Sequence, residues 1–326
     1  MTRLLVLGGT RFLGRALAEE ALGAGHEVTL FNRGITNPGL FPDAEHLHGD
    51  RSSDLSALGG REWDAVIDVA AYLPEVARLS AEALRDRVGQ YVYVSTVSVY
   101  AEHDRPEDQL EEAAVHSMDD AEDEGELYGA RKAACEAIVL DLYGARATVG
   151  RPGLIVGPND PTDRFDYWPR RLAIGGRVLG PGSPDDAVQF IDVRDLAAWL
   201  VGAAVEHVGG VFNLVGRPMP FAALIEACRA PGVAADVVWV PSDLLVREGV
   251  EEWMGIPLWI ASEGWRAANR VDGSRALAAG LRFRPLAETV EAARANPPVG
   301  GGQTISLERE QELLERLAPE QRPAGG

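Results

Sequence analysis

The chain has 326 residues, of which 46% are hydrophobic and 25% charged, and its formal net charge is −19. These values are typical of a globular protein long enough to bury a large core and form two lobes. A surface this acidic repels phosphate backbones, so we expect no nucleic-acid partner. No apolar run approaches the ~20 residues of a membrane span. The lack of such a run predicts no membrane partner. Two cysteines make no disulfide framework, which is typical of a reducing compartment, so we expect a cytoplasmic protein.

The first half of the chain alternates strand-like and helix-like segments. Short runs rich in β-branched residues predict strands at 3–7, 27–31, 65–70, 91–95 and 147–151. Apolar residues at helical spacing predict helices at 12–23, 75–87 and 127–143. Buried strands that alternate with helices indicate a parallel sheet covered on both faces. The predicted fold class is therefore α/β, a doubly wound Rossmann sheet.

After Pro152 the elements become shorter, and glycine and proline become frequent. A strand at 188–191 and a helix at 193–205 are expected to return to the sheet. Later strands at 211–215 and 237–240 and helices at 222–230, 286–295 and 307–317 predict a smaller C-terminal α/β substrate lobe. The expected domains are a dinucleotide-binding domain of residues 1–155 plus about 187–206, and a substrate-binding lobe of residues 156–186 plus about 207–326.

One segment is unusually acidic. Residues 102–126 contain twelve Asp or Glu and one Arg, and so carry −11 of the net charge of −19. Side chains of like charge at this density do not pack together and stay in solvent. We therefore expect a solvated loop between the strand at 91–95 and the helix at 127–143. A mobile lid that orders when a ligand binds is the alternative.

A glycine-rich turn follows the first predicted strand. Gly8 and Gly9 end that strand, and Gly14 lies where the next helix begins. Glycines let backbone N–H groups approach a pyrophosphate, and the N-terminus of the helix adds its positive dipole. Because the turn lies between a strand and a helix, residues 8–14 are predicted to bind a dinucleotide.

This turn resembles the GxxGxxG turn of extended or atypical short-chain dehydrogenases/reductases, the group that includes the NAD-dependent epimerase/dehydratase family. Gly8 and Gly14 match its first and third glycines, and Arg11 stands at the middle position. The resemblance extends over roughly residues 1–215. It implies that the cofactor is held here by Gly8, Thr10, Arg11, Phe12, Leu13 and Gly14.

The end of the second strand bears on the choice of cofactor. A site selective for NAD usually places an acid there to bind the ribose 2′-hydroxyl, but this chain has Asn32 and Arg33. The guanidinium of Arg33 is suited to bind a 2′-phosphate in bidentate fashion, and Arg11 is a second candidate. We therefore expect NADP(H) to be preferred, with NAD(H) as the alternative.

Four further segments resemble parts of the family's cofactor groove. The segment after the third strand contributes an Asp that faces the adenine, and other segments line the cofactor with their backbone or turn beneath the nicotinamide. By this resemblance, the additional cofactor-binding residues are Asp50, Arg51, Ala70, Ala71, Tyr72, Ser95, Pro152 and Gly153.

The predicted catalytic residues are Thr96, Tyr128 and Lys132. Tyr128 and Lys132, at i and i+4, share one helical face. A free phenol has a pKa of about 10 and is a poor base at neutral pH, and an ammonium group nearby stabilises its ionised form. We expect Tyr128 to exchange a proton with the substrate oxygen, and Lys132 also to bind the cofactor ribose. The resemblance implies that the hydroxyl of Thr96, four residues before Tyr100, steadies that oxygen.

Some residues differ from those of the family's dehydratases and epimerases, and these differences limit the reactions that we expect. The family's dehydratases carry Asp-Glu after the catalytic Thr, where this chain has Val97 and Ser98. Many nucleotide-sugar epimerases carry an Asn where this chain has Leu154. We therefore expect oxidation or reduction of a carbonyl or alcohol in a small organic substrate, for which a ring-bearing compound is one candidate. A sugar or nucleotide-sugar epimerase is one alternative, and an NADP-sensing regulator or RNA-binding relative is another.

Aromatic residues of the second lobe could line an apolar substrate pocket or belong to its core: Phe165, Tyr167, Trp168, Trp253, Trp259 and Trp265. His46 and His48 are interpreted as surface residues, and no cluster has the spacing of metal ligands. The resemblance leaves open a homodimer.

Overall fold

The computed structural model describes residues 1–326 except 70, 103–108, 263–264, 266–267, 298–303 and 319–326. The chain divides into two compact units. Unit 1 comprises Met1–Ile155, Phe190–Gly216 and Val271–Phe283, and unit 2 comprises Val156–Gln189, Arg217–Arg270 and Arg284–Gly326. No helix of the described residues is both long enough and apolar enough to cross a membrane.

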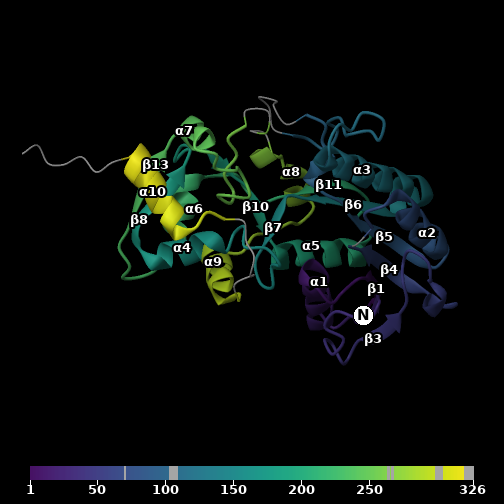
Figure 1. Ribbon diagram of the computed structural model, residues 1–326. Helices are drawn as coiled ribbons and strands as arrows, with labels where there is room; N and C mark the ends of the chain where they lie inside the picture. The colour runs from purple at the N-terminus through teal and green to yellow at the C-terminus, as the bar shows by residue number, and fades with distance from the viewer. Residues whose placement is uncertain (70, 103–108, 263–264, 266–267, 298–303, 319–326) are drawn as a thin grey trace, which may run out of the picture. The chain divides into compact units, whose positions relative to one another are not determined.

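Unit 1 is built on a seven-stranded sheet in the order β11-β6-β5-β4-β1-β2-β3 (Figure 1). Every neighbouring pair in this sheet is parallel. The strands are β1 (Arg3–Leu7), β2 (Glu27–Asn32), β3 (Glu45–His48), β4 (Trp63–Asp68), β5 (Val88–Val94), β6 (Ala147–Pro152) and β11 (Gly210–Leu214). The sheet runs outward in both directions from the β1–β4 pair, which confirms the predicted doubly wound Rossmann sheet.

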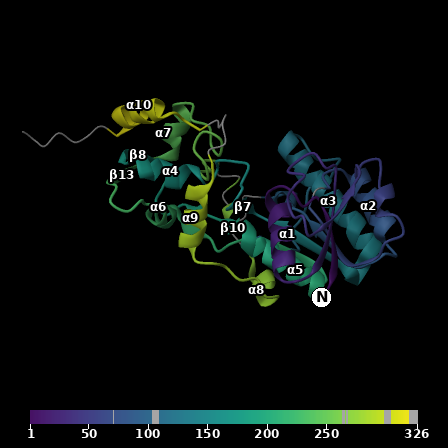
Figure 2. The ribbon, with the colours of Figure 1, turned by 90° about the horizontal axis from the view of Figure 1, so that it is seen from below.

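Helices cover both faces of this sheet. Leu4 and Val6 of β1 pack into one core with α1 (Phe12–Gly23) and α5 (Val193–Glu206), which lie side by side in Figures 1 and 2. Leu5 and Leu7 pack into the other core, with α2 (Pro74–Leu84) and α3 (Glu124–Tyr143). Successive residues of a strand point to opposite faces, so a strand covered on both sides has a continuous apolar sequence.

Unit 1 takes in two segments that the sequence placed in the substrate lobe. Strand β11 pairs with β6 in parallel, from Gly210 opposite Thr148 to Leu214 opposite Pro152. Helix α8 (Ser274–Ala278) packs against β11. Residues 207–216 and 271–283 are therefore corrected to unit 1. A short apolar strand has the same sequence pattern at the edge of a large sheet as in a small lobe. Local sequence therefore could not tell which of the two units contains this strand.

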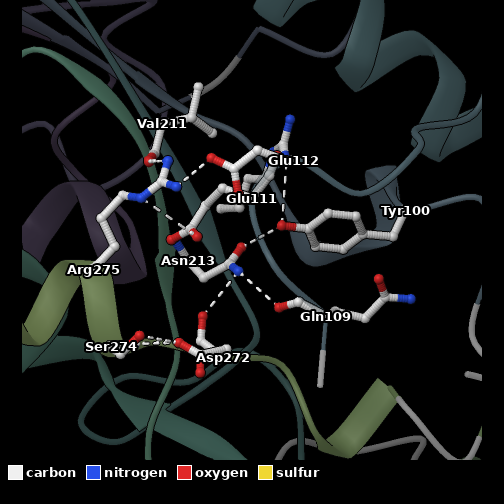
Figure 3. A network of polar contacts seen from close by, with 10 residues as sticks. Tyr100, Gln109, Glu111, Glu112, Val211, Asn213, Asp272, Ser274 and Arg275 are labelled. Carbon is white, nitrogen blue, oxygen red and sulfur yellow. Dashed lines mark hydrogen bonds and ion pairs between the residues drawn. The ribbon is translucent and has the colours of Figure 1, made fainter. Parts of the chain in front are cut away.

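The acidic segment is only partly in solvent. Gln109 and Glu111 are buried, with exposed fractions of 1% and 7%. Glu111 accepts a hydrogen bond from the backbone N–H of Asn213 at 2.9 Å and lies 3.6 Å from the guanidinium of Arg275 (Figure 3). The expectation that the whole segment stays solvated is wrong here, because a cation and a backbone donor distant in the sequence stabilise the carboxylate. Residues 103–108 of this segment lie outside the described residues.

Unit 2 contains two small sheets. Strands β8 (Gly176–Pro181) and β13 (Ala235–Val240) pair in parallel, and β9 (Ala187–Val188) and β12 (Met219–Pro220) pair antiparallel. Its helices are α4 (Tyr167–Ile174), α6 (Phe221–Ala227), α7 (Ser242–Arg247), α9 (Leu286–Ala295) and α10 (Leu307–Leu317). The remaining short strands of the chain are β7 (Leu154–Val156) and β10 (Phe190–Asp192), which pair with each other.

The last helix of unit 2 is fixed by a cap and an ion pair. The hydroxyl of Ser306 accepts a hydrogen bond from the N–H of Arg309 at 3.1 Å, a typical N-cap. Glu310 of α10 pairs with Arg171 of α4 at 2.6 Å, and both side chains are buried. Its second oxygen accepts a hydrogen bond from the N–H of Leu179 in β8 at 2.9 Å. Helix α10 is therefore an integral part of unit 2.

Candidate active site at the carboxyl edge of the sheet

The glycine-rich turn joins β1 to α1. Gly8 and Gly9 have φ angles of +127° and +100°, a region that strongly favours glycine. Helix α1 begins at Phe12, and a Cβ added at Gly14 would lie 2.6 Å from the N atom of Gly9. The glycine turn and the first turn of the helix therefore approach each other too closely for a side chain at Gly14. Thr10 and Leu13 of this segment are buried.

The loop after β2 is tied to this turn. The amide of Asn32 donates to the carbonyl oxygen of Gly8 at 3.4 Å and accepts from the N–H of Gly34 at 2.8 Å. Asn37 donates to the carbonyl oxygen of Thr10 at 2.9 Å. Arg33 is exposed and makes no hydrogen bond to the residues that the structure describes.

Arg11, inside the glycine turn, is also exposed, and its guanidinium makes no hydrogen bond within the described residues. Two guanidinium groups are thus available to a ligand in the segments around the turn.

Arg51, by contrast, is engaged within the protein. Its two terminal nitrogens donate to the two carboxylate oxygens of Asp68 at 2.6 Å each, and one of them also donates to Ser80 at 3.2 Å. Tyr91 donates to the same carboxylate at 2.8 Å. Asp68 is fully buried at the end of β4. This bidentate pair braces the strand end, and a cofactor-binding role for Arg51 stays a prediction.

Asp50, the other predicted residue of that segment, forms a local turn. Its carboxylate accepts hydrogen bonds from the backbone N–H and the hydroxyl of Ser52, at 2.9 and 2.5 Å. These hydrogen bonds lower the pKa of Asp50. The carboxylate is therefore ionised at neutral pH and can accept a hydrogen bond from a ligand.

The segment after β4 presents Ala71 and Tyr72; Ala70 lies outside the described residues. The carbonyl oxygen of Ala71 accepts a hydrogen bond from the hydroxyl of Tyr93 at 2.9 Å. The side chain of Tyr72 is 54% exposed, and its ring lies 6.3 Å from that of Tyr128 between centroids. This segment therefore extends from the strand end to the predicted catalytic tyrosine.

Lys132 is buried in the third turn of α3, with an exposed fraction of 2%. Its ammonium donates to the carbonyl oxygens of Val94 at 2.7 Å and Ala71 at 3.0 Å. It also lies 4.3 Å from the centroid of the Tyr93 ring and 5.3 Å from that of Tyr72. Burial lowers the pKa of Lys132 to about 8. The amine is thus held at the ends of β4 and β5 and can change its charge in mild alkali.

Helix α3 lies very close to the segment that follows β5. A Cβ added at Gly129 would overlap the carbonyl oxygen of Ser98, well inside van der Waals contact. Gly129 therefore allows the helix to bring its neighbour Tyr128 to this segment. Tyr128 is 37% exposed. Thr96 caps a short 3-10 turn there: its hydroxyl accepts from the N–H of Ser98 at 3.1 Å and contacts the Ser98 hydroxyl at 3.2 Å.

Ser95, Pro152 and Gly153 lie at the ends of β5 and β6. The N–H of Ser95 donates to the carbonyl oxygen of Gly150 at 2.7 Å. The Ser95 hydroxyl is buried and has no partner among the described residues. Pro152 ends β6, and Gly153 follows it. The structure therefore brings one unsatisfied hydroxyl to the edge of the sheet at which the predicted residues gather.

A buried network of polar side chains joins the segments next to this edge (Figure 3). The hydroxyl of Tyr100 donates to the side chain of Asn213 at 2.6 Å, and Arg151 donates to that hydroxyl at 3.2 Å. Arg151 also pairs with Glu136 of α3 at 2.6 Å. The amide of Asn213 in turn donates to the carbonyl oxygen of Gln109 at 3.2 Å. The segment after β5, the helix α3 and the acidic segment are therefore locked together.

The sequence pattern of the NAD dependent epimerase/dehydratase family matches residues 4–214. The chain belongs to this family. Its curated relatives include the chloroplast stem-loop binding protein of 41 kDa b of Arabidopsis thaliana, which is 30% identical over 71% of this chain and 63% of its own length. They also include 2-alkyl-3-oxoalkanoate reductase of Stenotrophomonas maltophilia, 28% identical over 70% of this chain and 75% of its own length. The chain thus spans less than two thirds of the plant relative.

Solved structures share the fold. The enzyme WbmH of Bordetella bronchiseptica in complex with NAD⁺ gives a TM-score of 0.64 at 20% identity, over 90% of this chain and 98% of its own. The UDP-glucose 4-epimerase of Thermus thermophilus with NAD gives 0.63 at 20% identity, over 90% of this chain and 100% of its own. At this level of identity the likeness concerns the architecture alone.

The residues of this family member fit a dinucleotide at two points. Side chains are missing at Gly9 and Gly14, so the backbone of the turn can approach a pyrophosphate, whereas the N–H of Gly8 donates to the carbonyl oxygen of Phe31 at 2.9 Å. Ser95 has a buried hydroxyl without a partner. No three His, Cys, Asp or Glu side chains of the described residues are arranged to hold a metal ion.

The sequence missed the contributions of Gly129 and of the two backbone acceptors of Lys132. A glycine in the interior of a predicted helix was the available signal for Gly129, because such a position is otherwise destabilising. The carbonyl oxygens of Ala71 and Val94 left no signal, since every residue carries one.

Among the aromatic residues of unit 2, Phe165, Trp168 and Trp259 are buried, and Trp265 is exposed. The indole of Trp168 donates to the carbonyl oxygen of Pro257 at 3.0 Å, a contact that belongs to the core. Most of the buried aromatic side chains therefore build unit 2, and Trp259 also lines a cavity in it.

Proposed function

We propose that this protein is an NADP(H)-dependent oxidoreductase that interconverts a carbonyl and an alcohol in a small organic substrate, with Tyr128 as its acid/base. The observation that carries the proposal is the placement of Lys132. Its buried ammonium lies at the ends of β4 and β5, one helical turn from a partly exposed Tyr128. A buried amine with a shifted pKa, beside an accessible phenol, is typical of a catalytic site.

In this proposal each residue has one task. Tyr128 donates a proton to the carbonyl oxygen during reduction and accepts it during oxidation. The ammonium of Lys132 stabilises the ionised phenol and binds a ribose hydroxyl, and the hydroxyl of Thr96 donates to the substrate oxygen. When bound, the nicotinamide dinucleotide supplies or accepts the hydride.

The preference for NADP(H) rests on charge. Arg11 and Arg33 are exposed, and their guanidinium groups make no hydrogen bond within the described residues. No carboxylate occupies the end of β2, where a ribose 2′-hydroxyl would require one. An arginine fork suits a 2′-phosphate, so the proposal assigns this group to Arg33, with Arg11 as a second ligand.

The class of reaction is supported by one relative and by two residues. The relative from Stenotrophomonas bears the name of a reductase of a ketone-containing acid. Val97 and Ser98 follow Thr96, so the acid pair of the family's dehydratases is missing here. Sugar epimerisation is the second candidate, since it would use the same tyrosine and the same hydride chemistry.

RNA binding, to which the name of the plant relative points, is disfavoured by the net charge of −19. A small molecule is therefore the proposed partner. The two cysteines, Cys135 and Cys228, are both buried and unpaired, which agrees with the proposed reducing, cytoplasmic location.

The test is turnover. Purified full chain is mixed with NADPH and a panel of ketones and aldehydes, and oxidation of the cofactor is followed by absorbance. We expect turnover with at least one carbonyl and a loss of at least about a thousandfold in kcat for Tyr128→Phe, which keeps the ring and removes the proton. Tight NADPH binding without turnover by the wild type across a broad panel would contradict the proposal and favour a cofactor sensor.

A further inference from the structure

Unit 2 contains a cavity of about 730 Å³. Its walls include residues that follow β8 and β13, and these parallel strands end at Pro181 and Val240. The cavity therefore lies beyond the carboxyl ends of both strands, which is the position at which parallel α/β sheets bind ligands.

One largely buried residue of this cavity has a side-chain amide without a protein partner among the described residues. Asn269 lines the cavity and is only 8% exposed. Its amide makes no hydrogen bond to any residue in the described part of the chain. Its amide atoms are not fully buried, so water or a ligand in the cavity can reach them. Asn269 thus offers both a donor and an acceptor to a molecule in the cavity.

Further polar groups converge on the same space. The hydroxyl of Ser242 accepts a hydrogen bond from the indole of Trp259 at 3.0 Å, which leaves its own hydrogen to donate. Asp186 is held in place by the N–H of Ser183 at 2.8 Å. Gly182 keeps the room between these groups open, because a Cβ there would lie 3.0 Å from the Ser242 hydroxyl.

The charge of the lining selects against anions. Among the described residues of the lining, the charged side chains are Asp185, Asp186 and Arg270, which leave one negative charge. The carboxylate of Asp185 is exposed and makes no hydrogen bond or ion pair to the residues described, although its backbone N–H donates to the Ser183 hydroxyl at 3.2 Å. A ligand here needs hydroxyl donors for the carboxylates and an apolar body for the walls formed by Phe221, Leu258 and similar side chains.

We propose that this cavity binds an uncharged, hydroxylated ring and excludes phosphorylated ligands. The inference concerns unit 2 alone and does not depend on the proposed function. It narrows the class of ligand to neutral cyclic polyols or their glycosides, and it argues against sugar nucleotides.

The test uses two matched probes, methyl glucoside and glucose 6-phosphate, added to the full chain without cofactor. Binding is measured by saturation-transfer NMR. We expect the neutral glycoside to bind at least tenfold more tightly than the phosphate. Asn269→Leu, of similar volume, should weaken glycoside binding about tenfold, as expected for the loss of about one hydrogen bond to a buried group.

Asp185→Asn should reduce severalfold the ratio of the affinity for methyl glucoside to the affinity for glucose 6-phosphate. Asp243→Asn makes the same charge change in unit 2 at an exposed residue outside the lining, and should leave both affinities unchanged. Because Asp185 is exposed, its variant keeps the proposal testable if Asn269→Leu fails to fold.

Failure of the glycoside to bind, tighter binding of the phosphate, or an unchanged affinity in Asn269→Leu would overturn the inference. None of these outcomes affects the turnover test with Tyr128→Phe, because cofactor oxidation is measured separately. Conversely, if the chain binds the glycoside but reduces no carbonyl, the ligand assigned to the cavity stands and the proposed function is wrong.

Discussion

The ammonium of Lys132 donates a hydrogen bond to the carbonyl oxygen of Val94 at 2.7 Å, where β5 ends. A side chain of α3 is thereby fixed to the edge of the sheet at which the glycine-rich turn lies. The amine is desolvated and lies one helical turn from the partly exposed Tyr128, so its charge state matters to the proposed proton transfer.

The first prediction concerns pH. Burial lowers the pKa of Lys132 to about 8, so the ammonium is present below this pH and is lost as the pH rises through it. We expect kcat/KM, which reports the free enzyme, to fall above about pH 8. Lys132→Met should lose most activity, and its residual rate should lack this fall. If kcat/KM of the wild type stays constant well above pH 8, the charge of Lys132 does not have the assigned role.

The second prediction concerns the close approach of α3. Gly129→Ala places a Cβ against the carbonyl oxygen of Ser98, so the helix must shift or the protein loses about 1–3 kcal/mol. Gly202→Ala is the matched control: Gly202 lies within α5 with nothing within 4 Å of an added Cβ. It should stabilise by about 0.5–1 kcal/mol. Urea unfolding and kcat are measured for both, and equal effects would contradict the packing argument.

The third prediction concerns cofactor choice. Arg33→Ala should weaken NADPH binding about 10- to 100-fold, the loss expected for charge-assisted hydrogen bonds, and should leave NADH binding nearly unchanged. Arg78→Ala, an exposed arginine of α2 that pairs with Glu82, serves as the control. Calorimetric titration with both cofactors gives the result. A wild type that binds NADH more tightly than NADPH would refute the preference.

The fourth prediction concerns stability and pH in unit 2. Burial raises the pKa of Asp166 to about 7, although Asn296 and Arg170 donate to its carboxylate. The folded form therefore keeps a proton that the unfolded form releases near pH 4, so stability falls as the pH rises from about 4 to 7. Asp160 and Asp163 add negative charge nearby.

Asp166→Asn should flatten this dependence by an amount on the order of 2–4 kcal/mol. Unfolding is followed by calorimetry at several values of pH between 4 and 8. Asp243→Asn, on the surface, should keep the slope of the wild type. If stability still falls with rising pH in Asp166→Asn, other groups cause this dependence.

The fifth prediction concerns the acidic segment. Arg275 pairs with Glu112 and lies 3.6 Å from the buried Glu111. Arg275→Ala leaves the Glu111 carboxylate without its cation, so we expect a loss of about 1–3 kcal/mol, reduced from that of a fully buried pair by the 41% exposure of the arginine. Limited proteolysis should cut residues 109–116 faster. Unchanged cleavage would show that the ion pairs of Arg275 do not hold the segment in place.

Local patterns predicted the parts of the site that lie close together in the sequence. Gly8, Gly14 and the spacing of Tyr128 and Lys132 each follow from geometry within one turn or one helix. The pairing of Glu111 with Arg275 could not be read in this way, because the two residues meet only after β11 has joined the sheet edge. The same holds for Arg51, whose guanidinium is engaged by Asp68 across two strand ends.

The central claim is that hydride passes between a nicotinamide and a carbonyl carbon while Tyr128 transfers the proton. Its most direct test uses NADPH in which both hydrogens at C4 of the nicotinamide are replaced by deuterium, with a carbonyl compound that the chain turns over, and NMR of the product. The account predicts one deuterium on the new carbinol carbon for each NADPH consumed, and none with Tyr128→Phe. Deuterium that stays in the cofactor, or a product epimerised without net consumption of NADPH, would contradict it.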